Sequence, residues 1–169
     1  MAELEMMTAA CEAAGADYVA MAVDEAEGEQ LMAARRMALP AVERRGVVLI
    51  EDVGVPIPAI PDLLRGVESI ATDHAVTIAV VGHAGDGNFH PLIVQERGSD
   101  DSARRCALAY AAVMKLALEL GGTVSGEHGV GSLKSPWLRQ QLGDDVVAVT
   151  RAIKAALDPR GILNPGKWL

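Results

Sequence analysis

One short segment restricts the fold of this chain more than any other, because residues 82–90 contain a turn signal between two apolar stretches. The dipeptide Asp86-Gly87 is a favoured centre for a tight β-hairpin, since glycine readily adopts the positive φ that such turns require. The flanking residues 76–82 and 89–95 have the length and composition of β-strands. The sequence therefore predicts two antiparallel strands at this point of the chain.

The same hairpin carries two histidines. If the turn is centred on Asp86-Gly87, His83 lies directly opposite His90 on one face of the strand pair. Directly opposed residues have Cβ atoms about 4.5–5.5 Å apart, a separation that suits two imidazoles binding one metal ion. Two histidines on a hairpin are equally compatible with ordinary surface residues, and a metal site needs at least a third ligand.

A second segment, residues 121–131, offers that third ligand. It is rich in glycine, which is typical of backbone that approaches a ligand closely, and it places Glu127 next to His128. Adjacent side chains on an extended backbone point to opposite sides, so Glu127 would face the metal while His128 faces another part of the pocket. A local turn would instead bring both side chains to the same place, and the sequence leaves both arrangements open.

The rest of the chain alternates helical and strand-like stretches. Helices are predicted at residues 2–14, 25–45, 61–74, 100–120, 135–142 and 144–157, and further strands at residues 18–23 and 47–53. Pro40 is expected to break or bend the second helix. This mixed order predicts an α+β fold, an antiparallel sheet flanked by helices, and residues 1–169 are expected to form one domain.

Composition excludes several classes of function. The net charge of −8 and the presence of only five aromatic residues argue against nucleic acid and against anionic membrane surfaces as partners. No apolar run reaches the roughly 18 residues of a membrane span, so no integral membrane segment is predicted. Cys11 and Cys106 stand in no metal-binding spacing, and the acidic beginning of the chain is unlike a signal peptide. We expect a cytoplasmic protein with reduced cysteines.

Three motifs together resemble those of the FAD-linked oxidase C-terminal domain family, which includes flavin subunits of glycolate oxidase, D-lactate dehydrogenases and D-2-hydroxyglutarate dehydrogenases. In this chain the motifs are residues 82–91, residues 125–131 followed by Lys134, and residues 158–167. The resemblance extends over essentially the whole chain and is strongest to the glycolate oxidase branch. It implies the cap, or substrate, domain of a flavoenzyme of the vanillyl-alcohol-oxidase type.

The resemblance implies the ligands of a metal and of a flavin. His83, His90 and Glu127 would hold a divalent metal, which the ligand types suggest is zinc, with manganese, iron or cobalt as alternatives. Glu127 would thereby take part in cofactor binding, and Asn164 would lie near the flavin. Lys134 is expected to be a solvated lysine near the start of a helix.

The implied reaction is the oxidation of a D-2-hydroxy acid to the 2-oxo acid, in which the hydroxyl loses a proton while FAD accepts a hydride. His128 would contact the substrate as general base, and Arg35 would bind its carboxylate. Relatives that act on D-2-hydroxyglutarate have an asparagine where this chain has Leu92 and a lysine near Ile50. These differences favour a short monocarboxylate such as glycolate or D-lactate.

In the family the flavin is held mainly by an N-terminal FAD-binding domain, which we expect to be absent from this chain. A separate FAD-binding chain would then be its partner, or the chain would be a truncated fragment that is inactive alone. A metal-binding module without turnover is the main alternative function. A metallohydrolase would leave residues 158–167 without a role, and association with further copies of the chain is left open.

Overall fold

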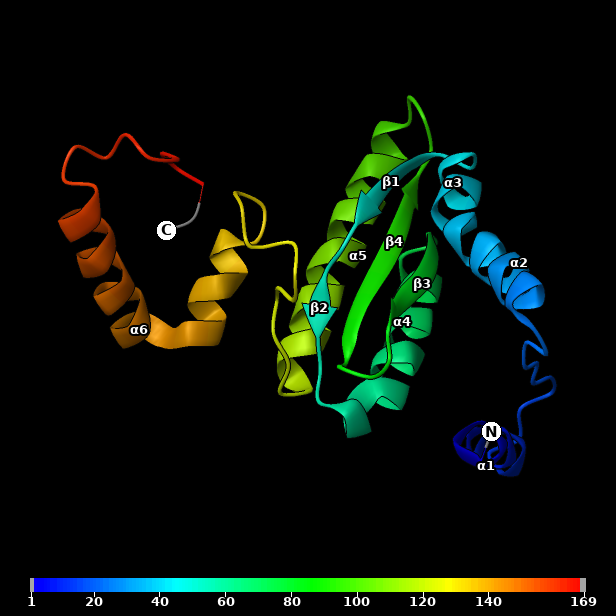
Figure 1. Cartoon of the computed structure of the whole chain (residues 1–169). Coiled ribbons are helices and arrows are strands. Elements are labelled where there is room, and N and C mark those ends of the chain that lie inside the picture. Colours follow the sequence, from blue (N-terminus) through cyan, green and yellow to red (C-terminus); the bar gives the residue numbers. More distant parts are fainter. Residues whose placement is uncertain (1, 168–169) are drawn as a thin grey trace. The chain divides into compact units, whose positions relative to one another are not determined.

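The structure, a computed structural model, describes residues 2–167 and is shown in Figure 1. The chain divides into two compact units, Met1–Ala41 and Val42–Leu169. The first unit contains the helices α1 (Ala2–Ala13) and α2 (Glu25–Arg36). Asp24 begins α2 as its N-cap, because its side chain accepts a hydrogen bond of 2.8 Å from the Glu27 N–H.

The strand predicted at residues 18–23 was wrong. The backbone there is irregular, and the side chains of Tyr18 and Val23 are 84% and 88% exposed. A strand of this length needs a neighbour that pairs with its backbone and covers its apolar side chains. The structure gives these residues no such partner in the part of the chain that it describes.

The bend predicted near Pro40 was confirmed. The helical stretch separates at Met37 into α2 and the short helix α3 (Ala38–Glu43). Pro40 lies within the first turn of α3, where a missing N–H breaks no helical hydrogen bond.

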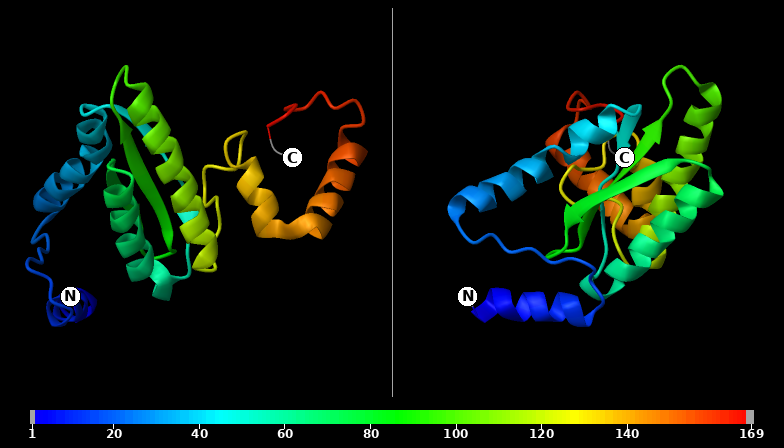
Figure 2. Two further views of the ribbon diagram at one scale, coloured as in Figure 1. Left: turned by 180° about the vertical axis from the view of Figure 1, so that it is seen from behind. Right: turned by 90° about the vertical axis from the view of Figure 1, so that its right-hand side faces the viewer.

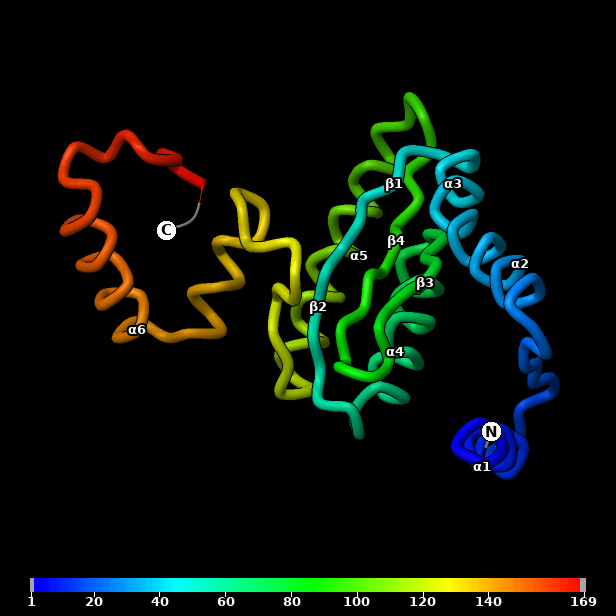
Figure 3. The backbone as a smooth tube through the Cα atoms, viewed as in Figure 1, coloured from blue at the N-terminus to red at the C-terminus, as the bar shows by residue number. Residues whose placement is uncertain are grey.

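An antiparallel sheet lies at the centre of the second unit. Its strands are β1 (Val47–Ile50), β2 (Val53–Gly54), β3 (Thr77–His83) and β4 (Asn88–Gln95). The central strand β4 pairs with β3 along one edge and with β1 and then β2 along the other. In the backbone trace of Figure 3, β4 lies between β3 on one side and β1 and β2 on the other. The predicted α+β fold with an antiparallel sheet was therefore confirmed.

A proline in β4 separates β1 from β2. Both strands pair with β4 in one continuous register, so Glu51 and Asp52 between them lie opposite Pro91 and His90. Pro91 has no N–H to donate, which interrupts the ladder, although the Glu51 N–H still donates to the Pro91 carbonyl at 2.9 Å. The interruption places two buried acidic residues in the middle of the sheet.

Two helices cover one face of this sheet, α4 (Ile60–Asp73) and α5 (Asp100–Glu119), as the two views in Figure 2 show. Phe89 and Ile93 of β4 pack against them, together with Val113 and Met114. Because side chains alternate along a strand, His90 and its neighbours of even number point to the other face of the sheet. The hydrophobic core therefore supports the strand that carries the candidate site.

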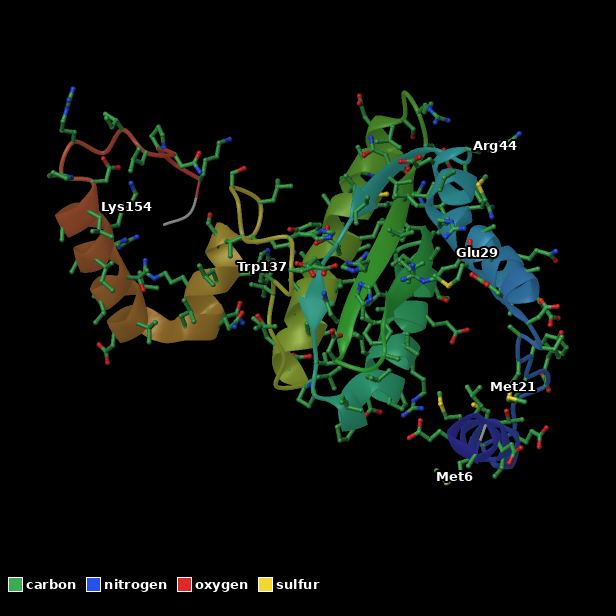
Figure 4. All side chains as sticks on the ribbon, viewed as in Figure 1. Met6, Met21, Glu29, Arg44, Trp137 and Lys154 are labelled. Carbon is green, nitrogen blue, oxygen red and sulfur yellow. The ribbon has the colours of Figure 1, made fainter. Side chains whose placement is uncertain are left out.

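The helix α6 (Ser135–Leu157) follows a glycine-rich loop and is kinked at Gly143, whose φ is 75°. This confirms the prediction of two shorter helical segments, since glycine tolerates the left-handed conformation that ends the first. Trp137 on the first segment packs against the core of the sheet (Figure 4). Among residues 2–167, no helix is long and apolar enough to cross a membrane.

Candidate metal centre

The β3–β4 hairpin differs from the prediction in its register. His83 pairs with Asn88, and Val81 pairs with His90, so the predicted direct pairing of His83 with His90 was wrong. The connecting turn occupies four residues instead of two, which moves the register by an even number of positions. A shift of this parity leaves every side chain on its original face. The two histidines are diagonal neighbours, and their ring centroids lie 5.6 Å apart.

Local hydrogen bonds explain the wider turn. The N–H groups of Asp86 and Gly87 both donate to the His83 carbonyl, at 3.2 and 3.1 Å, and Asp86 Oδ1 accepts from the Asn88 N–H at 3.2 Å. Gly87 has a φ of 76°, and a Cβ at this position would lie 2.1 Å from the Val55 carbonyl oxygen. The turn-forming role predicted for Asp86 was therefore confirmed, and glycine is required beside it.

The glycine-rich loop joins the sheet next to β2. Gly54 and Thr123 exchange two backbone hydrogen bonds, of 3.0 and 2.8 Å. Gly122 allows this approach, because a Cβ there would lie 2.0 Å from the Gly54 carbonyl oxygen. The loop then continues along the strand towards Asp52.

Asp52 holds the following residues through its carboxylate. Oδ2 accepts from the N–H groups of Gly126 at 2.9 Å and His128 at 2.8 Å, and Oδ1 accepts from the Glu127 N–H at 3.3 Å. The Ser125 hydroxyl donates to Oδ2 at 3.3 Å. The Asp52 side chain is completely buried. None of the sequence motifs contains Asp52, although an acidic pair inside an apolar strand is a visible signal of a special role.

These contacts keep Asp52 ionised. Burial acts to raise its pKa, but the N–H groups of His128 and Glu127, the charge of Lys134 and the N–H of Gly126 together bring the pKa below its usual value. A carboxylate that accepts several backbone hydrogen bonds is stabilised in its charged form.

The structure brings the three predicted metal ligands together. Glu127 Oε1 lies 3.2 Å from His90 Nε2 and 3.5 Å from His83 Nε2. One donor atom from each residue falls within a group in which all separations are at most 4.8 Å. The His90 side chain is 9% exposed, whereas His83 and Glu127 are 42% and 54% exposed. The group is therefore buried on the side of His90 and open to solvent on the side of His83 and Glu127.

The ring of His90 is oriented by contacts at the nitrogen that faces away from Glu127. Its Nδ1 lies 3.2 Å from the Glu51 carbonyl oxygen and 3.8 Å from Asp52 Oδ1. A hydrogen on Nδ1 that is donated to this carbonyl leaves Nε2 with a free lone pair, directed towards Glu127. This is the tautomer that a metal ligand requires.

His128 lies beside the same group. Its ring stacks on that of His90, with centroids 4.8 Å apart and planes inclined by 11°, and its Nε2 is 3.7 Å from Glu127 Oε1. The His128 side chain is 49% exposed. The local turn that the sequence left open is therefore the arrangement present, and the extended alternative is not.

Lys134 is not the solvated lysine that was predicted. It is only 7% exposed, and its Nζ donates to the Asp52 carbonyl oxygen at 2.8 Å. Lys134 does occupy the position before α6, but its long side chain reaches back into the site. Burial lowers the pKa of Lys134, although the negative charges of Asp52 and Glu51 oppose this.

Glu51 and Tyr110 place further buried polar atoms on the helix-covered side of the sheet. Glu51 is 1% exposed, and within residues 2–167 neither its Oε2 nor the Tyr110 hydroxyl has a hydrogen-bond partner. Burial raises the pKa of Glu51 to about 8, against the opposing charge of Lys134. Both residues line a pocket of about 300 Å³ that His128 also lines.

The other two predicted site residues lie elsewhere in the chain. Arg35 is an exposed residue of α2 in the first compact unit. Asn164, with a φ of 49°, lines a pocket of about 540 Å³ between the second half of α6 and the following residues. Their contacts with substrate and flavin stay predictions.

Residues 158–167, here called the tail, are held by Asp158. Its carboxylate accepts from the N–H groups of Ile162 and Leu163, both at 3.0 Å, and it pairs with Lys154, which Figure 4 labels. The hydrogen bond from Lys154 and those from the two N–H groups lower the pKa of Asp158.

Known proteins resemble this chain over nearly its whole length. The family described as FAD linked oxidases, C-terminal domain, matches residues 1–168. The chain is 40% identical over 166 residues to the glycolate oxidase subunit GlcD of Bacillus subtilis and 39% identical over 155 residues to the subunit of that name in Escherichia coli K12. It is 35% identical over 158 residues to a probable mitochondrial D-lactate dehydrogenase of Danio rerio.

The matched lengths are unequal. These three alignments cover 98%, 91% and 92% of the chain, but only 35%, 31% and 32% of the respective relatives. The chain therefore spans about a third of the length of the relatives that it matches.

Proposed function

Because the chain belongs to the family of FAD-linked oxidase C-terminal domains, we propose that it is the substrate- and metal-binding part of an FAD-dependent oxidoreductase that converts a D-2-hydroxy acid to the 2-oxo acid. The observation that carries this proposal is the convergence of His83, His90 and Glu127 beside a fourth polar side chain, His128. The names of the relatives, glycolate oxidase subunit and D-lactate dehydrogenase, support this class of reaction.

The donor set fits a divalent metal. Two imidazole nitrogens and one carboxylate oxygen are ligands that zinc binds readily, and manganese, iron or cobalt accept the same types. When bound by His83, His90 and Glu127, such an ion would supply Lewis acidity that makes the substrate hydroxyl more acidic. The open side of the group leaves room for a substrate, since two of the three side chains are about half exposed.

His128 is the proposed general base. Stacking on His90 limits the orientation of its ring, while its exposure leaves it accessible to a substrate hydroxyl. An imidazole has a nitrogen lone pair that is suited to accept that proton at neutral pH. FAD would supply the acceptor for the hydride from the carbon.

The remaining roles depend on the family resemblance. We propose that Arg35 binds the substrate carboxylate and that Asn164 contacts the flavin. The flavin itself would be held mainly by residues outside this segment, either in another domain or in a separate chain, since the segment matches only about a third of each relative. A cytoplasmic location stays a prediction from composition.

A short monocarboxylate is the proposed substrate. Ile50 and Leu92 pair with each other across β1 and β4, and both are apolar where relatives that bind a dicarboxylate have polar residues. Glycolate and D-lactate fit this absence of a distal polar partner.

Flavin reduction tests the proposed reaction. The flavin-loaded protein that carries this chain should be bleached by glycolate or D-lactate, and His128→Ala should slow this by about 10²- to 10⁴-fold. His74→Ala is the matched control, because His74 lies at the end of α4 outside the site. Unchanged flavin reduction in the His128 variant would contradict the proposed role of this histidine.

Metal analysis separates the enzyme from a simple metal-binding module. We expect about one zinc ion per chain, lost in His83→Ala. Zinc binding without flavin reduction by any 2-hydroxy acid would favour the metal-binding module. Absence of bound metal would contradict the proposed centre.

A further inference from the structure

We propose that Asp52 is the positioning residue of this site: its buried carboxylate shapes residues 125–128 so that Glu127 is held against His83 and His90 before any metal binds. The inference rests on the proposed metal centre, and it concerns a residue that none of the three sequence motifs contains. Asp52 lies on the strand segment between β1 and β2, whereas its partners lie more than seventy positions further along the chain.

Both oxygens of this carboxylate accept hydrogen bonds from the loop. Oδ2 accepts from the Ser125 hydroxyl and the N–H groups of Gly126 and His128, and Oδ1 accepts from the Glu127 N–H. Four donors from one loop thus meet a single side chain. Since Asp52 is 0% exposed, water does not compete for these hydrogen bonds. The loop conformation is therefore coupled directly to the position of one side chain.

Three consecutive N–H groups on one anion dictate the local backbone. In an extended segment, successive N–H groups point in opposite directions, as do successive side chains. Turning three of them towards Asp52 curves the backbone into an anion-binding concavity. That curvature is what brings the side chains of Glu127 and His128 together, with Nε2 and Oε1 only 3.7 Å apart. Asp52 thus selects the arrangement that the sequence alone left open.

The hairpin approaches this loop from the other side. A Cβ on Gly126 would lie 2.4 Å from Asn88 Oδ1, so glycine permits the loop to pass directly over β4. Asn88 pairs with His83, and His90 lies two positions further along β4. Asp52 itself lies opposite His90, with Oδ1 3.8 Å from Nδ1. The same aspartate therefore contacts both segments that carry the ligands.

Asp52 is unsuited to the other roles that an aspartate takes in such a site. A metal ion would have to compete with the hydrogen bonds that both oxygens of its carboxylate already accept from the loop. Asp52 also stands outside the group of residues whose donor atoms converge. A general base must reach the substrate, whereas this carboxylate is completely buried. Positioning is the role that its contacts support.

Lys134 balances the charge that this role requires. Its Nζ lies 3.8 Å from Asp52 Oδ2 and donates to the Asp52 carbonyl oxygen at 2.8 Å. A buried carboxylate without a countercharge would be strongly destabilising. Lys134 belongs to the end of the same loop, so the ion pair also ties its far end to the strand.

Metal affinity in the chain itself tests the proposal. Residues that orient metal ligands typically contribute about 10- to 100-fold to affinity. We expect Asp52→Asn to weaken zinc binding by about this factor in a chelator competition. In the metal-free variant, the amides of Gly126, Glu127 and His128 should exchange their hydrogens faster. Asp158→Asn is the matched control, because it removes an equivalent buried carboxylate from the tail.

A milder variant covers the case in which Asp52→Asn does not fold. Ser125→Ala removes one of the four donors and should weaken zinc binding about 2- to 10-fold. If the wild-type chain binds no zinc, the proposed metal centre is overturned together with this inference. If the wild type binds zinc and the folded Asp52 variant, or Ser125→Ala, binds it equally well, only the inference is overturned. Equal weakening by Asp52→Asn and Asp158→Asn would also overturn it, because the effect would then be general destabilisation.

Discussion

Two buried aspartates, Asp52 and Asp158, perform the same local task in different regions. Each accepts hydrogen bonds from backbone N–H groups, and each has a lysine partner, Lys134 and Lys154 respectively. The residues that donate hydrogen bonds to the Asp158 carboxylate lie within five positions of it in the sequence, whereas those that donate to the Asp52 carboxylate lie 73 or more positions away.

The two aspartates differ in how far their hydrogen bonds reach along the sequence, and this decides whether they shape one turn or join distant segments. Asp158 ends a helix and shapes the turn that follows, so its loss should remain local. Asp52 joins a strand to a distant loop, and this junction brings His90 and Glu127 within 3.2 Å of each other. A cluster of side chains that comes from segments far apart in the sequence depends on such junctions.

Metal binding should differ most between the two regions. His90→Ala removes the buried ligand and should reduce zinc affinity by more than the roughly 100-fold expected for a residue that only orients ligands. Chelator competition on the purified chain measures this effect. His74→Ala, the histidine at the end of α4, should bind zinc as the wild type does. Retained affinity in His90→Ala would place the metal elsewhere.

The pH dependence of stability should distinguish the sheet from the tail. Burial raises the pKa of Glu51 from 4.5 to about 8. Below pH 4.5 the carboxyl is protonated in the folded and unfolded states, so it does not change the free energy of unfolding. Above that pH the unfolded chain loses the proton more readily, which lowers the free energy of unfolding, and the full reduction is reached above about pH 8.

Glu51→Gln should therefore unfold like the wild type near pH 4.5 and be more stable at pH 9, by up to about 5 kcal/mol. Thermal or urea unfolding of the metal-free chain at both pH values measures the difference. An equal gain at both pH values would show that Glu51 does not titrate in this range.

Two glycines make the same comparison in the backbone. Gly122→Ala should destabilise the chain by about 2–4 kcal/mol, because its Cβ would lie 2.0 Å from the Gly54 carbonyl oxygen. Gly161→Ala in the tail meets no atom within 4 Å, and only the strain of its φ of 62° should remain, about 1 kcal/mol. Urea unfolding of both variants measures the two losses in the free energy of unfolding. Equal losses would mean that the contact between Gly122 and β2 is easily relaxed.

The smallest effect is expected from Asp158→Asn. At pH 7 it should speed hydrogen exchange at the Ile162 and Leu163 amides and leave zinc affinity unchanged. Because the pKa of Asp158 is lowered in the folded chain, its contribution is present above its usual value of 3.8 and is lost as the pH falls through the lowered pKa. The variant and the wild type should therefore become alike in acid. Slow exchange at both amides in the variant would show that other contacts hold the tail.

Predictions from sequence succeeded where the signal was local. The helix predicted at residues 100–120 is present as Asp100–Glu119, with Ser99 as its N-cap. The helix predicted at residues 61–74 is present as Ile60–Asp73. Caps, glycine stops and apolar periodicity act over a few residues, so a single sequence displays them. The apolar run at residues 18–23 failed because a strand also needs a partner, which local pattern does not supply.

The hairpin shows the same boundary within one motif. Its two strands and the role of Asp86 were predicted, but the register was displaced because the turn contains four residues. This error does not separate the two histidines, since an even shift keeps His83 and His90 on one face. The family resemblance predicted that Glu127 joins the two histidines, and the structure brings the three side chains close together.

The sequence by itself determined most of the helices, the two strands of the hairpin and the α+β class, because these follow from local propensity. It also showed which side chains have the chemistry of the proposed metal ligands. Only the tertiary structure decided the register of the hairpin, the burial of Lys134 and the task of Asp52. Each of these depends on atoms more than fifty positions apart or on a choice between turns of similar stability. Such choices are made by packing and by the need to satisfy every buried polar group, which no local pattern records.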